Sequence, residues 1–144
     1  MLTPEEVNEK VDKGWIKSKM WFELLAIEKK VTEDTLKAHV EKIKKDRDTI
    51  ILTENFAETQ RIENPFETVP EAFSQAVEVE LLTRDIESLL TLVIFFAPSA
   101  IEILAPEKMT LDIRTVQVIM NSVADLIHRY AAHGAGGVVV SAKK

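Results

Sequence analysis

The sequence contains no cysteine. Disulfide bonds, thiolate metal sites, iron–sulfur clusters and cysteine nucleophiles are therefore excluded. Long hydrophobic runs are also missing, because the most apolar stretch, residues 89–98, is about half the length that a membrane-spanning helix needs. The opening residues, MLTPEEVNEK, carry acids where a secretory signal would carry basic and then apolar residues. We therefore expect a soluble, cytoplasmic protein with no membrane partner.

Positive charge is also scarce. The 144 residues include 18 Lys and Arg against 24 Asp and Glu, a formal net charge of −6. Nucleic-acid binding usually needs clustered positive charge, so this balance disfavours broad contact with a phosphate backbone. Hydrophobic residues at 46% and charged residues at 29% are typical of a globular protein. The length is that of one domain, and we expect a single domain over residues 1–144.

The residue pattern predicts alternating helices and strands. Thr3 with Glu6 has the spacing of a capping box, and Gly14 is typical of a helix end. Apolar residues at every second position over 15–28 predict a strand with one buried face. Further strands are expected at 48–53, 74–82 and 100–104. Thr32 and Thr83 are expected to cap the two helices between them, and a long helix should cover about 112–132.

This order predicts an α+β protein with a ferredoxin-like β-α-β-β-α-β core, an antiparallel sheet with two helices on one face. The core is expected over 15–105, after a short N-terminal helix over 1–14. A long C-terminal helix over 106–133 and a flexible tail over 134–144 complete the predicted domain. Another two-layer α+β design would fit the same order.

Two segments of the second half, Ala97–Pro106 and Ser74–Glu80, occur together with Gly136-Gly137. In these residues the chain resembles a family of small, mainly archaeal proteins of unassigned function with a ferredoxin-like arrangement. The resemblance implies a cytoplasmic archaeal protein and supplies no catalytic residue. In element order alone the chain also looks like ACT-type regulatory modules, which is an analogy of fold.

Histidines and glycines gather at the C-terminal end of the long helix. Phosphate-binding glycine loops precede a helix, whereas Gly134, Gly136 and Gly137 follow one, so they are interpreted as a helix stop. Asp125 and His128 share a helix face three residues apart. A metal or enzymatic site there would need a third ligand, such as His39 or a glutamate. An exposed polar stripe of the helix is the favoured interpretation of the pair.

The outer face of the predicted sheet, the face away from its helices, is the expected partner surface. It is predicted to carry Trp15, Lys17, Lys19 and Trp21, with Glu78 and Glu80 on the neighbouring strand. Tryptophan is enriched at the centres of protein interfaces. RNA-recognition modules stack bases on aromatic residues of this face, so an RNA- or ribosome-associated role is the alternative. The glutamates and the absence of an RNP1-type run favour a protein partner.

Two other segments suggest contacts. The helix expected over 84–97 is apolar nearly all round, so a second element must cover it. The long C-terminal helix is the candidate within the chain, and a homodimer would account for the apolar surface that remains. The predicted contact residues of the helix over 84–97 are Leu89, Leu92, Val93 and Phe96. Residues 54–73 form either an ordered arm or a mobile loop. A small ligand is hypothesised between this arm, with Phe56 and Phe66, and Arg84 at the start of the second helix.

No motif places a nucleophile beside a base, and no cofactor or metal site is indicated. The sequence therefore favours a non-enzymatic, homo-oligomeric interaction or regulatory module that binds a protein partner or a small effector. The alternatives are the RNA- or ribosome-associated factor and a small enzyme or metal site near Asp125 and His128.

Overall fold

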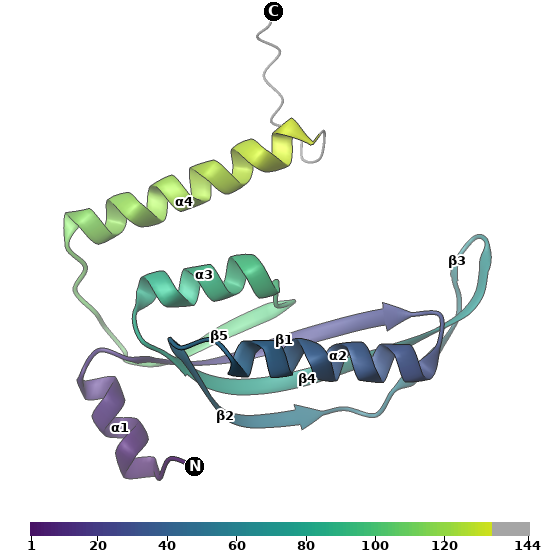
Figure 1. The fold of residues 1–144 in the computed structure, drawn as a ribbon, viewed down its shortest axis with the longest axis horizontal. Coiled ribbons are helices and arrows are strands. Elements are labelled where there is room, and N and C mark those ends of the chain that lie inside the picture. The colour runs from purple at the N-terminus through teal and green to yellow at the C-terminus, as the bar shows by residue number, and fades with distance from the viewer. Residues whose placement is uncertain (134–144) are drawn as a thin grey trace, which may run out of the picture. The chain divides into compact units, whose positions relative to one another are not determined.

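The computed structural model describes residues 1–133. The chain divides into two compact units, Met1–Lys108 and Met109–Lys144. The first unit contains the sheet and three helices, and the second contains helix α4 (Ile113–Ala132) (Figure 1). The predicted flexible tail and the glycine stop after His133 lie outside the described residues.

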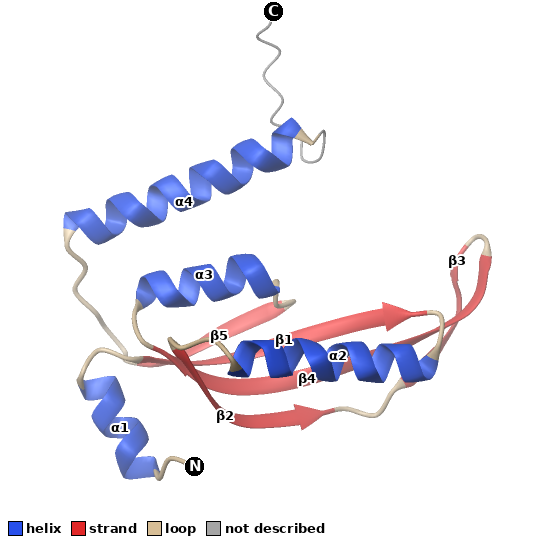
Figure 2. Ribbon diagram, viewed as in Figure 1, coloured by secondary structure: helices blue, strands red, loops and turns tan. Residues whose placement is uncertain are grey.

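The sheet has five strands, all paired antiparallel (Figure 2). They are β1 (Ile16–Ala26), β2 (Thr49–Phe56), β3 (Gln60–Phe66), β4 (Val69–Thr83) and β5 (Ala100–Ala105). The order is β2-β4-β1-β5, and β3 also pairs with β4. The helices of this unit are α1 (Pro4–Asp12), α2 (Lys29–Lys44) and α3 (Ile86–Phe96). The α+β class is confirmed. The predicted four-stranded arrangement is not matched, because a hairpin adds β3 as a fifth strand.

Helices α2 and α3 cover one face of the sheet (Figure 1). Strand β1 presents buried and half-buried residues alternately from Ile16 to Phe22, because successive side chains of a strand point to opposite faces. The buried set of β1 meets the matching set of β4 and the apolar stripes of the two helices. The core contains Ile16, Met20, Phe22, Leu36, Val40, Ile43, Val77, Val79, Leu81, Leu89 and Leu92.

Helix α1 begins as the sequence predicts. The Thr3 hydroxyl accepts a hydrogen bond from the Glu6 amide at 3.1 Å, and the Glu6 carboxylate accepts one from the Thr3 amide at 3.1 Å. The hydrogen bond from the Thr3 backbone lowers the pKa of Glu6 below its ordinary value. Gly14 has φ +108° just after the helix, a conformation that suits glycine. The predicted capping box and glycine stop are confirmed.

The two predicted threonine caps are wrong. Thr32 lies inside the first turn of α2, whose N-cap is Glu28, and its buried hydroxyl donates to the Glu28 carbonyl at 2.9 Å. Thr83 is the last residue of β4, and Asp85 caps α3 instead. Both threonines are drawn into the protein interior, where packing against the sheet outweighs their preference for an exposed helix start.

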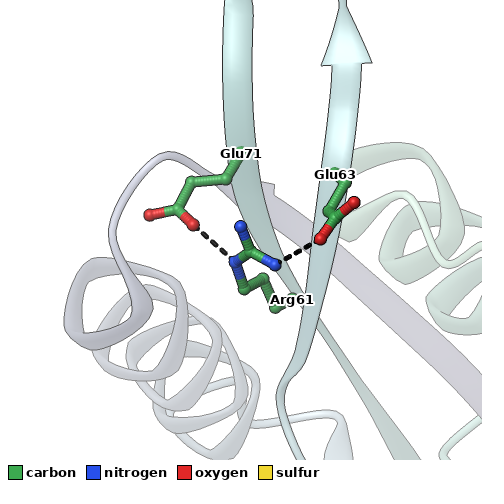
Figure 3. A network of polar contacts seen from close by, with 3 residues as sticks. All are labelled: Arg61, Glu63 and Glu71. Carbon is green, nitrogen blue, oxygen red and sulfur yellow. Dashed lines mark hydrogen bonds and ion pairs between the residues drawn. The ribbon is translucent and has the colours of Figure 1, made fainter.

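Residues 54–73 form an ordered hairpin arm. Strand β2 continues to Phe56, and β3 then pairs with the first half of β4 around a tight turn. Arg61 on β3 forms ion pairs with Glu63 on its own strand and with Glu71 across the hairpin (Figure 3). The ordered-arm alternative is therefore the one that the structure shows.

Candidate functional site: a groove between helix α1 and the outer sheet face

One end of the outer sheet face is apolar and covered. Leu82 on β4 points away from the core residue Leu81, yet it is fully buried at 0% exposure. In the strand register it lies between Lys17 of β1 and Ile50 of β2. Val7 of α1 is also buried. Helix α1 therefore packs over this end of the outer face.

A groove of about 580 Å³ runs beside this helix. Its walls come from the start of α1, from β2 and from the neighbouring positions of β1 and β4. The lining residues are Met1, Leu2, Pro4, Val7, Asn8, Lys17, Ile50, Ile51, Leu52, Thr53 and Glu80. Small-molecule sites are typically concave and mostly apolar, with a few polar groups that fix orientation, and this volume falls in their usual range.

The charged side chains in the lining are Lys17 and Glu80. The Lys17 ammonium lies 3.1 Å from the Glu80 carboxylate, and the two side chains are 30% and 25% exposed. The predicted pairing of the first strand with the strand of Glu78 and Glu80 is confirmed. The pair brings one positive and one negative charge together beside the apolar residues Ile50 and Leu52. Such an arrangement can orient a ligand that carries both charges.

The two tryptophans do not form a shared stacking platform. Trp15 precedes β1, and the Lys10 ammonium of α1 lies 4.6 Å from its ring centroid. Trp21 lies six residues further along, roughly 20 Å away at the rise of a strand. Its cross-strand neighbours are Glu78 on β4 and Ala100 on β5. Trp15 therefore has Lys10 beside its ring, whereas Trp21 has Glu78 opposite it on the next strand.

The remaining lysine of this face has acidic neighbours. Lys19 is directly opposite Glu80 on one side and Glu102 on the other. With Glu78 two residues from Glu80 on β4, acids outnumber bases on this part of the sheet. A phosphate backbone would be repelled by that excess. Lys19 and Trp21 lie outside the groove lining, whereas Lys17 lies within it.

The predicted self-association residues are only partly available. Leu89 and Leu92 are 4% and 1% exposed and belong to the core, so their assignment to a subunit interface is wrong. Val93 and Phe96 are partly buried against the same core. Phe95, which the sequence analysis did not single out, is 75% exposed. An apolar run does not show which side of its helix meets the sheet.

The predicted ligand site between the arm and the second helix is not assembled. Phe66 is opposite Val69 at the start of β4, whereas Arg84 follows the last residue of that strand. A strand of 15 residues separates them, roughly 45 Å at the usual rise. Phe56 also belongs to the hairpin arm, and Arg84 instead forms an ion pair with Asp48 at 2.7 Å.

Two of the candidate metal ligands, Asp125 and His39, have other partners. Asp125 forms an ion pair with Arg129 at 3.0 Å within α4. The Nε2 atom of His39 donates to the Phe96 carbonyl at 2.9 Å, and the ring packs edge-on against Phe22 and Phe96. Within residues 1–133 no three His, Asp or Glu residues come together as a metal site. In the same range no helix is both long and apolar enough to cross a bilayer.

The model of the MJ0538 family matches residues 17–144. This chain belongs to the MJ0538 family. The match begins at Lys17. Helix α1, which forms one side of the groove, therefore lies outside the matched residues of this MJ0538-family protein. No curated protein and no solved structure matches the chain. The expected archaeal source and cytoplasmic location stay predictions.

The sequence analysis missed the residues that make this groove. Leu82 directly follows Leu81, and this pair interrupts the alternation of β4. Two adjacent buried leucines in a strand indicate that both faces are covered at that point. The signal was therefore present, but it does not say which element provides the second cover.

Proposed function

We propose that this MJ0538-family protein is a binding module whose groove holds a small zwitterion with an apolar side chain. The observation that carries the proposal is the Lys17–Glu80 pair beside apolar walls. A ligand carboxylate would face Lys17, and a ligand ammonium would face Glu80. The apolar part would lie against Ile50 and Leu52. Apolar amino acids have this combination of groups.

A binding role fits the chemistry of the pair better than a catalytic one. Lys17 and Glu80 neutralise each other, so neither is held as an isolated acid or base beside a reacting atom. The role would be regulatory, with α1 closing over the ligand. We also propose that the sheet is related to the ferredoxin-like fold. The strand order β2-β4-β1-β5, with β3 as an inserted hairpin, supports this relation.

The RNA- or ribosome-associated alternative has less support. Its proposed contact residues share their face with Glu78, Glu80 and Glu102. Base stacking on Trp15 would also have to displace Lys10 from the ring. We expect no salt-dependent affinity of the full chain for single-stranded RNA in a filter-binding assay.

The first experiment is calorimetric titration of the full chain with leucine. Acetyl-leucine, which lacks the ammonium, and leucine amide, which lacks the carboxylate, are the comparison ligands. Each should bind about tenfold more weakly than leucine, because each can form only one of the two charge contacts, with Lys17 or with Glu80. If leucine, isoleucine and phenylalanine all fail to bind, the small-effector proposal is wrong and the groove would suit a protein partner.

Substitutions sharpen this test. Lys17→Met and Glu80→Gln should each weaken leucine binding, and Leu52→Glu should abolish it by placing a charge against the apolar part of the ligand. Thr91→Glu, on the exposed side of α3, is the matched control and should bind leucine normally. In the Glu80→Gln variant, acetyl-leucine is expected to bind more tightly than leucine. If acetyl-leucine also binds more tightly than leucine in the unaltered chain, the ligand is an anion and the zwitterion proposal is contradicted.

We also propose that the chain is a homodimer. The exposed apolar residues Phe95 on α3 and Ile101 and Ile103 on β5 support this. Light scattering should give a dimer mass for the unaltered chain and a folded monomer for Phe95→Glu. Val93→Glu is a poorer choice, because Val93 packs against the core and the charge would destabilise the fold. A monomeric unaltered chain would contradict the proposal.

A further inference from the structure

The second half of β1 has an open edge. Strand β4 pairs with β1 along its whole length, from Ile16 to Ala26. Strand β5 pairs only with residues from Lys17 to Trp21 on the other side. Among the residues that the structure describes, no strand continues that side beyond Trp21. The sheet therefore lacks a neighbour along the last five residues of β1, the stretch called here the β1 edge (residues 22–26).

The backbone groups that face this gap can be identified. The Trp21 carbonyl accepts a hydrogen bond from the Ser99 amide at 2.7 Å, so it points to the side of β5. Because a strand repeats every two residues, the N–H and C=O groups of Glu23 and Leu25 point to the same side. Unpaired groups in such a row are a template for a further strand.

A cavity of about 200 Å³ adjoins the β1 edge on the face covered by the helices. It lies between the edge, α2 and the end of α3, and its apolar lining includes Phe22, Leu24, Leu36 and Phe96. His39 also lines it and is held in place by its hydrogen bond to the Phe96 carbonyl. A strand laid along the edge would point every second side chain toward this face. The cavity has room for one leucine-sized side chain.

The opposite face of the edge carries the acidic residue Glu23 and the exposed apolar residue Leu25. Glu23 is exposed there, two residues from Trp21, and Glu78 is directly opposite Trp21 on β4. A basic side chain of an added strand would meet the Glu23 carboxylate and lie near the partly buried Trp21 ring, and Glu78 lies across β1 from it. Carboxylates attract a cation through charge, and a tryptophan face attracts it through its quadrupole. The charge on this face therefore selects a basic residue.

We propose that the β1 edge binds an extended peptide segment of a partner protein, in which apolar and basic residues alternate. The peptide would add a strand to the sheet, with an apolar side chain in the cavity and a basic one beside Glu23 and Trp21. This site shares no residue with the lining of the α1 groove. A second copy of the chain is a poorer occupant through β5, because Glu102 would meet the acids of the edge.

The test uses the full chain and fluorescence anisotropy of labelled short peptides. The probe has leucine and lysine at alternating positions. One comparison peptide has the same composition with leucines and lysines in separate blocks, and another alternates leucine with glutamate. The probe should bind at least about tenfold more tightly than either. Equal affinity for the block peptide would show attraction by charge alone, and equal affinity for the glutamate peptide would remove the charge argument. Either result would overturn the proposal.

Two variants of one residue test whether the backbone is recognised. Leu25→Pro removes an N–H group that points to the open edge and leaves the bonds to β4 in place, and proline is tolerated on edge strands. It should weaken the probe about tenfold, whereas Leu25→Ala, which keeps the N–H group, should weaken it much less. Equal weakening by both would overturn backbone recognition. Circular dichroism verifies that Leu25→Pro is folded, and the peptide comparison on the unaltered chain does not depend on that variant.

Discussion

The two faces of strand β1 differ although they alternate residue by residue. Met20 is completely buried and belongs to the core under α2 and α3. Its neighbour Lys19 lies on the outer face, between Glu80 and Glu102. One face is buried under two helices from Ile16 to Phe22, and the other is covered only where α1 lies. The comparison indicates that the helix-covered face provides stability, whereas the partly covered face leaves room for ligands.

The same comparison can be made between Leu81 and Leu82 on β4. Both are fully buried, but Leu81 packs in the main core and Leu82 packs on the outer side, near α1. Helix α1 has nine residues, and Val7 is its buried residue. A cover of this size contributes far less apolar area than α2 and α3 do. We therefore expect α1 to detach more easily than the rest of the unit.

The largest expected difference is between Met20→Ala and Lys19→Ala. Removing the Met20 side chain leaves a cavity in the core and should lower the free energy of unfolding by about 2–5 kcal/mol. Lys19→Ala should change it by no more than about 0.5 kcal/mol, because its charge lies near the surface between acids. Urea unfolding of the two variants measures both values. Similar losses would contradict the division between the faces.

A smaller and more local effect is expected for Leu82→Ala. It should lower the free energy of unfolding by about 2 kcal/mol at most and speed hydrogen exchange in α1 before that in the sheet. Leu81→Ala is the matched control, and it should destabilise the strands and helices of the core together. If Leu82→Ala accelerates exchange equally in α1 and β4, the helix is not a separate cover. The groove would then be as rigid as the core.

The smallest expected effect is a loss of stability of α1 at acid pH, through its capping box. Glu6 has a pKa below its ordinary value because it accepts hydrogen bonds from Thr3 in the folded state. The stabilisation is therefore fully present above the ordinary pKa of a glutamate and is lost as the pH falls through the lowered value. Trp15 fluorescence should report loosening of α1 at acid pH. Glu6→Gln should lose most of this pH dependence, and an unchanged acid response would assign it to other carboxylates.

Much of the fold could be predicted from short-range patterns. The capping box of Thr3 and Glu6 depends only on a three-residue spacing, and the alternation of β1 depends only on the geometry of a strand. The helix predicted over 112–132 is present as α4, because its apolar period and its Asp112 cap lie within one segment. These features are local, so neighbouring residues are enough to specify them.

The candidate sites were predicted less well, because they depend on segments far apart in the sequence. The apolar run of α3 does not show that Leu92 faces the sheet and Phe95 faces outward. The sequence predicts a strand over 74–82 only, whereas β4 has 15 residues and places the tip of the arm and Arg84 at its opposite ends. The Lys17–Glu80 pairing was predictable from the strand order. Its position in a groove beside α1 was not.

The sequence by itself determined the α+β class, the two faces of β1 and the start of α1. Periodicity and capping are interactions between residues close together in the chain, and they act before any distant contact forms. The tertiary structure alone decided that α1 covers Leu82, that β3 joins the sheet and that β5 ends before the second half of β1. Each of these results depends on where separate segments meet. Several alternative contacts between these segments have similar energies, and the packing of the whole unit decides which of them form.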